Sequence, residues 1–146
     1  MTSVNTYLTF NGNCMEAFNF YKSVLGGEFA HVGKFSEMPS DPNLPPVGEE
    51  DKDKIMHISY PIGNTVLMGS DTGGEWAPNF KQGNNFSLSI SAESKADADR
   101  IFNALSEDGK VVMPMADTFW ESYFGMFTDK FGINWMVSYD QLHKDK

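Results

Sequence analysis

The chain has 146 residues, 40% of them hydrophobic and 14% aromatic, which is typical of one packed domain. Its formal net charge of −9 would repel nucleic-acid phosphates and anionic headgroups, so neither nucleic acid nor a membrane is an expected partner. The single cysteine, Cys14, cannot form an internal disulfide, and no segment resembles a signal peptide or a membrane span. These features favour a cytoplasmic protein.

The first half of the chain has the pattern of a strand, a helix and three more strands. Residues 4–10 alternate between apolar and polar side chains, which predicts a half-buried strand. A helix should follow, with Asn13 and Glu16 as its capping box and Gly26 near its end. The remaining strands are expected over residues 28–36, 54–60 and 64–70.

The same order restarts at Asn85. Ser94 and Asp97 can cap the second helix, and three strands are expected over residues 110–115, 121–128 and 133–138. The sequence therefore predicts an α+β fold made of two βαβββ modules, residues 1–71 and 84–139, within one domain spanning residues 1–146. Four of the seven prolines lie in a long loop, residues 38–52, which could be a lid over a cavity or a solvated excursion.

Several motifs resemble those of a known family. They lie at the first strand and helix and at the last turn: residues 7–13, Glu16-Ala17, Phe20-Tyr21, Leu25-Gly26-Gly27, and Asp129-Lys130-Phe131-Gly132-Ile133-Asn134-Trp135. The chain resembles the PhnB-like branch, also called the 3-demethylubiquinone-9 3-methyltransferase family, of the vicinal-oxygen-chelate (glyoxalase, bleomycin-resistance and dioxygenase) superfamily. This resemblance implies curved mixed sheets around a cavity, usually in a homodimer. The methyltransferase name does not establish a reaction, because a fold can host many functions.

Metal-dependent enzymes of that superfamily hold a divalent ion on the first and last strands of each module. The matching positions here are, to within about one residue on the fourth strand, Asn5, Leu67, Asn85 and Met136. Two amides and two apolar side chains cannot replace the hydration shell of a divalent ion, and Val66 or Met68 would not improve the set. We therefore expect no metal at these vestigial positions and no other cofactor.

Alternation also selects the residues that would face a cavity. His57 should lie opposite Met56 and Ile58, where its imidazole could bind a ligand or move a proton, or could serve structure alone. Polar residues of the other strands share that face, and two loop tryptophans could add flat contacts. The expected ligand-binding residues are Tyr7, Thr9, Ser87, Ser89, Trp76, Trp120, Asn134 and Met136. Asp117 and Glu121 could be paired carboxylates or merely solvated.

The sequence alone leaves enzymatic activity open. The favoured hypothesis is a metal-independent binder of a small, partly apolar molecule, acting as a homodimer. The alternative is a glyoxalase-like enzyme, of lyase, isomerase or dioxygenase type, that uses His57 or a displaced metal site. The sequence identifies neither a ligand nor a substrate.

Overall fold

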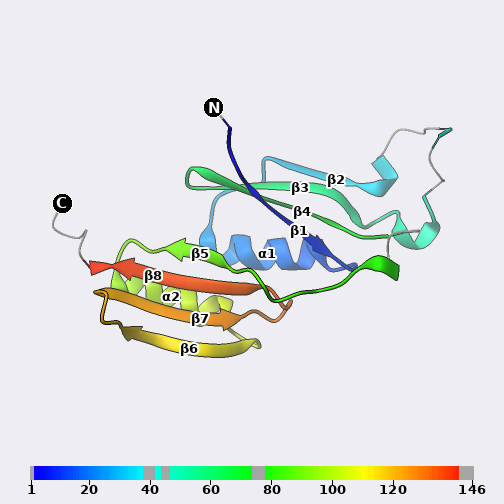
Figure 1. Ribbon diagram of the computed structural model, residues 1–146. Coiled ribbons are helices and arrows are strands. Elements are labelled where there is room, and N and C mark those ends of the chain that lie inside the picture. The colour runs from blue at the N-terminus through cyan, green and yellow to red at the C-terminus, as the bar shows by residue number, and fades with distance from the viewer. Residues whose placement is uncertain (1, 38–41, 44–46, 74–77, 142–146) are drawn as a thin grey trace. The chain divides into compact units, whose positions relative to one another are not determined.

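The chain divides into two compact units, residues 1–81 and 82–146 (Figure 1). The computed structural model describes residues 2–37, 42–43, 47–73 and 78–141. The long loop at residues 38–52 and the linker that carries Trp76 are therefore described only in part. Within the described residues, no helix has the length and apolar character needed to cross a membrane.

The first unit is a four-stranded mixed sheet with one long helix packed on it. Its elements are β1 (Thr6–Phe10), α1 (Cys14–Leu25), β2 (His31–Lys34), β3 (Ile55–Ile62) and β4 (Thr65–Asp71), with two 3₁₀ turns, η1 (Phe35–Glu37) and η2 (Glu49–Asp51), between β2 and β3. The strand order is β1-β4-β3-β2. Strand β1 runs parallel to β4, and the other neighbouring strands are antiparallel.

The second unit repeats this arrangement. Its elements are β5 (Leu88–Ser91), α2 (Lys95–Leu105), β6 (Lys110–Asp117), β7 (Ser122–Thr128) and β8 (Asn134–Asp140). The strand order is β5-β8-β7-β6, with β5 and β8 parallel. The expected α+β class and the duplicated βαβββ order are confirmed. Strand β5 begins three residues later than the alternation from Asn85 suggested.

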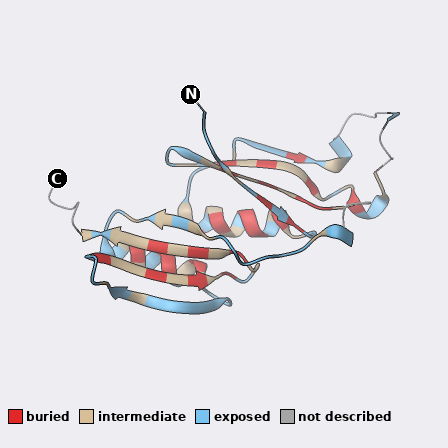
Figure 2. Ribbon diagram, in the orientation of Figure 1, coloured by how far each residue is buried: buried red, intermediate tan, exposed pale blue. Residues whose placement is uncertain are grey.

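Each helix buries one face against its own sheet (Figure 2). In α1 the buried side chains are Cys14, Ala17, Phe18, Tyr21 and Val24, and in α2 they are Ala98, Ile101, Phe102 and Leu105. A glycine receives a helix phenylalanine in each unit, because a Cβ atom at Gly69 would lie 2.8 Å from the Phe18 ring and one at Gly125 would lie 2.8 Å from the Phe102 ring. These contacts identify the sheet face that points toward each helix.

The N-terminus of α1 is not capped by the residue that the sequence predicts. Asn13 makes no side-chain capping hydrogen bond. Instead, one carboxylate oxygen of the buried Asp71 accepts hydrogen bonds from the backbone N–H groups of Gly12 and Cys14, and the other accepts from Ile55. The expected Asn13 and Glu16 capping box is wrong because a carboxylate 57 residues away in sequence from Cys14 takes its place. In α2, by contrast, Ser94 accepts from the N–H of Asp97, as expected.

The Asp-x-Phe-Gly-x-x-Trp motif has a structural explanation in the turn between β7 and β8. Asp129 is buried, and its Oδ1 accepts hydrogen bonds from the N–H groups of Phe131 and Ile133. Its Oδ2 accepts from the indole N–H of Trp135 at 2.8 Å. One carboxylate thus fixes both the turn and the large core side chain that follows it.

Candidate functional site

Strand pairing places the candidate residues of the first unit on the sheet face opposite α1. Leu8 pairs with Gly69, and Gly69 pairs with Ile58, so these three residues share the face that meets Phe18 of α1. Alternation then puts Tyr7, Thr9 and His57 on the other face. Tyr7 and Thr9 are exposed, and His57 is half-buried.

Three rings from different strands gather on this face. The ring centroids of Tyr7 and His57 are 5.8 Å apart, and those of His31 and His57 are 5.7 Å apart. Both pairs are tilted by 32°. We call Tyr7, His57 and His31 the ring row. Within the part of the chain that the structure describes, none of the three side chains makes a hydrogen bond or an ion pair.

His31 is the member that sequence reasoning missed. It lies in β2 and pairs with Ser59, while its neighbour Val32 pairs with Ile58 and therefore shares the helix-facing side. A Cβ atom at Gly33 would lie only 3.1 Å from Nε2 of His31, so the imidazole lies along its own strand in the space that this glycine leaves open. The register between β2 and β3 brings the two histidines together, and their separation in sequence gave no sign of it.

The matching face of the second unit has a different chemistry. Register aligns one residue from each strand, in the order Ser89, Met136, Met126 and Met113. We call Met136, Met126 and Met113 the methionine row. It lies opposite the helix-facing Trp135, Phe127 and Gly125, and thioethers of this kind adapt readily to apolar surfaces.

Asn134 and Ser87 lie beside this row and are less available to a ligand. The amide oxygen of Asn134 accepts a hydrogen bond from Thr128 Oγ1 at 2.6 Å, and its nitrogen donates to the carbonyl of Phe86 at 3.4 Å. Ser87 is half-buried just before β5. Asn134 is therefore already engaged in holding β7, β8 and the approach to β5.

The loop between β6 and β7 carries exposed aromatic side chains. Phe119 is 94% exposed and Trp120 is 50% exposed, with their rings in edge contact at 4.9 Å. Trp120 also contacts Phe124 of β7 at 6.0 Å. The second tryptophan expected at a ligand, Trp76, lies outside the described residues.

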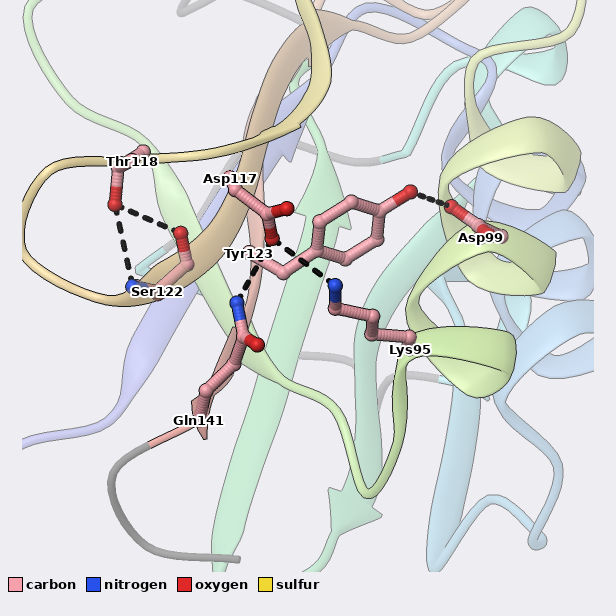
Figure 3. A network of polar contacts seen from close by, with 7 residues as sticks. All are labelled: Lys95, Asp99, Asp117, Thr118, Ser122, Tyr123 and Gln141. Atoms are coloured by element: carbon pink, nitrogen blue, oxygen red, sulfur yellow. Dashed lines mark hydrogen bonds and ion pairs between the residues drawn. The ribbon is translucent and has the colours of Figure 1, made fainter.

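Asp117 and Glu121 do not form a pair of acids. Figure 3 shows that Asp117 contacts Lys95 of α2 and Gln141, at 3.0 Å and 2.8 Å. These hydrogen bonds from Lys95 and Gln141 hold the pKa of Asp117 below its ordinary value, so it remains a carboxylate at neutral pH. Glu121 is exposed in the turn, with a φ of 62°. In the same network Tyr123 donates to Asp99, which raises the pKa of the phenol.

The vestigial metal positions do not fit a divalent ion. Leu67 is buried and pairs with Thr6, on the side that faces α1. Val66 and Met68, which lie within the one-residue uncertainty of the sequence prediction, occupy the opposite face. Asn5 accepts a hydrogen bond from the N–H of Val66, Asn85 is exposed ahead of β5, and Met136 offers a thioether. Across the described ranges, no three His, Cys, Asp or Glu side chains cluster as metal ligands would.

Cys14 is not a candidate nucleophile. Its thiol is fully buried beside Asp71, and burial, with a further contribution from the Asp71 charge, raises its pKa far above the ordinary value. A thiol in this state carries almost no reactive thiolate at neutral pH.

Comparison with known proteins identifies the family. A family model described as 3-demethylubiquinone-9 3-methyltransferase matches residues 2–138. Protein YjdN of Escherichia coli (strain K12) is 31% identical over 140 residues, which cover 92% of this chain and 93% of YjdN. The crystal structure of protein PA1353 from Pseudomonas aeruginosa is 41% identical, with a TM-score of 0.80, and covers 96% of this chain and 98% of PA1353.

Two further structures connect the sequence family to its fold. A putative 3-demethylubiquinone-9 3-methyltransferase, PhnB protein, from Bacillus cereus is 25% identical, with a TM-score of 0.74 over 94% of this chain and 99% of its own. A glyoxalase/bleomycin resistance protein/dioxygenase family enzyme from Burkholderia phytofirmans PsJN is 12% identical, with a TM-score of 0.61 over 94% and 99%, and shows the shared fold. The chain belongs to the PhnB-like, 3-demethylubiquinone-9 3-methyltransferase family and has the glyoxalase fold.

Proposed function

We propose that this protein binds a small, partly apolar organic molecule and that binding requires no metal ion. The ring row carries the proposal. Tyr7 is 47% exposed, and its ring meets the half-buried His57 on the face opposite α1. Partly exposed rings with unused polar atoms suit a ligand that needs both flat apolar contact and a few hydrogen bonds.

The chemistry of the ring row supports a ligand of mixed character. In the first unit the phenol and the two imidazoles can donate or accept hydrogen bonds at the rim of their rings. A formal net charge of −9 disfavours a strongly anionic ligand.

An enzymatic role for His57 has less support than binding. A catalytic imidazole is normally oriented by a second group, most often a carboxylate. In the described segments no carboxylate forms a hydrogen bond or ion pair with His57. A glyoxalase-like reaction through His57, or through a displaced metal site, therefore remains the alternative proposal, and turnover of the bound molecule is its test.

The experiment is a thermal-shift screen of small organic molecules in the presence of a chelator, followed by affinity measurement on variants. A ligand that binds only the folded state raises the melting temperature. His57→Ala should weaken binding about two- to tenfold, because a ring contact is worth roughly 0.5–1.5 kcal/mol beyond its buried area. Val32→Ala, next to His31 but on the opposite face, is the matched control and should bind normally. Equal affinity in wild type and His57→Ala would refute the proposal.

We also propose that the protein is a homodimer. Strand β6 is an edge strand of its sheet, and Val111, Val112 and Met113 are 46%, 57% and 45% exposed. Apolar residues on an edge strand favour association because they leave both hydrogen-bonding groups and apolar surface uncovered. Sedimentation at micromolar concentration should give a dimer, and a persistent monomer would contradict this.

A further inference from the structure

We propose that His31 and His57 form a two-imidazole site for a borderline transition-metal ion, with Cu²⁺ the strongest binder. The site is separate from the vestigial positions, since it lies on β2 and β3. It uses the two histidines of the ring row that we assign to an organic ligand, yet it does not depend on that ligand. Imidazole nitrogen suits Cu²⁺, Ni²⁺ and Zn²⁺, and among them affinity is generally highest for Cu²⁺.

The spacing of the two rings fits one shared ion. A metal bound about 2.1 Å from an imidazole nitrogen lies about 3.2 Å from the ring centroid, so two such rings are separated by about 5.3 Å at a tetrahedral angle and by about 6.4 Å at most. The centroids of His31 and His57 are 5.7 Å apart, inside this range. The spacing of the rings is therefore compatible with one nitrogen of each imidazole binding the same ion.

The surroundings of His31 support the same geometry. Gly33 pairs with His57 in the β2–β3 register, and a Cβ atom at Gly33 would lie 3.1 Å from Nε2 of His31. Nε2 of His31 therefore lies at the level of His57 along the sheet. The absence of a side chain at Gly33 leaves the imidazole the space it needs to reach that level.

Exposure and hydrogen bonding leave both imidazoles available as ligands. His31 is exposed and His57 is half-buried, so water can complete the coordination of a bound ion. Within the described residues, neither imidazole is held by a hydrogen bond or an ion pair. With two protein ligands the ion should be bound reversibly and removed by a chelator, in contrast to the closed four-ligand sites that hold structural metals.

The test is a Cu²⁺ titration followed by electron paramagnetic resonance. His143 lies outside the described residues, so all proteins carry His143→Asn to remove that imidazole. The parent should bind one Cu²⁺ with the hyperfine signature of two nitrogen ligands. Either His31→Asn or His57→Asn should weaken binding at least about tenfold, because loss of even an outer partner of a metal ligand costs about 10–100-fold.

Two further variants test whether Cu²⁺ binding depends on the position of the His31 imidazole and not only on the presence of both histidines. Gly33→Ala keeps both imidazoles but places a methyl group against Nε2 of His31, and should weaken Cu²⁺ binding. Val32→Ala, on the opposite face of β2, should leave it unchanged. Parent-like binding in His31→Asn, or a parent without a nitrogen signature, would overturn the site. His31 is exposed, so His31→Asn keeps the test valid if His57→Asn folds poorly.

The outcome is distinguishable from that of the proposed function. Organic-ligand binding is measured with a chelator present, whereas the Cu²⁺ titration uses the ion alone. A loss of Cu²⁺ binding with intact ligand binding removes only the metal site. Intact Cu²⁺ binding without any organic ligand removes only the proposed function.

Discussion

The two units share a strand order but use it with different chemistry. In each, one buried carboxylate accepts three hydrogen bonds, two on Oδ1 and one on Oδ2. Asp71 joins the start of α1 to the start of β3, whereas Asp129 closes a local turn and holds one indole. The faces opposite the helices differ as well, with rings in the first unit and methionines in the second. The fold therefore tolerates different anchors, and the sheet faces opposite the helices are where the two modules differ.

The largest expected effect tests how each unit receives its helix. A Cβ atom at Gly69 would lie 2.9 Å from the backbone oxygen of Leu8 as well as against the Phe18 ring. One at Gly125 would meet the flexible Met115 side chain at 2.7 Å and the Phe102 ring, and would lie farther from backbone, 3.1 Å from the oxygen of Met113. Gly69→Ala should cost about 3 kcal/mol and Gly125→Ala about 1 kcal/mol, within the usual range for overpacking. Urea unfolding measures both, and an equal cost would contradict the comparison.

The next effect tests the two carboxylates. Asp71→Asn and Asp129→Asn should each cost about 2 kcal/mol, because one retained oxygen can serve two N–H groups while the new amide faces the third donor. In the second unit that donor is a side chain, so Trp135→Phe should be less harmful in the Asp129→Asn background than in wild type. The third donor to Asp71 is the backbone N–H of Ile55. Because shortening the Ile55 side chain does not remove this donor, no such rescue exists for Asp71. A double-mutant cycle with no coupling at Trp135 would count against the assigned role of Asp129.

The smallest expected effect concerns the stability of the α2 N-terminus at acidic pH. The N–H of Glu93, and then Arg100, lower the pKa of Asp97 from its ordinary value of 3.8. A carboxyl group with a lowered pKa in the folded chain stabilises the fold above pH 3.8 and loses this contribution as the pH falls below it. Asp97 is half-buried and still in contact with solvent, so the effect should be under about 1 kcal/mol. The stability difference between wild type and Asp97→Asn should shrink between pH 6 and pH 3, and a pH-independent difference would exclude the linkage.

Sequence patterns predicted the fold and the sides of its strands because both depend on local periodicity. Alternation placed Tyr7 and His57 opposite Leu8 and Ile58, and the cap of α2 lies within four residues of Ser94. The features that were missed depend on distant segments. Asp71 replaces the cap at Asn13 from the far end of the module, and His31 meets His57 only through the register of β2 with β3. The one-residue uncertainty at Leu67 could not be removed from the sequence. The pairing register of β1 with β4 decides which sheet face Leu67 occupies.

The central claim is that the PhnB-like fold here holds an organic molecule without a metal. Native mass spectrometry of the protein, purified from its host with a chelator present, tests this most directly because it weighs the ligand, the metal and the number of subunits together. We predict a dimer that carries a small organic mass and no stoichiometric metal. A stoichiometric divalent metal that survives the chelator, and whose removal releases the organic mass, would contradict it.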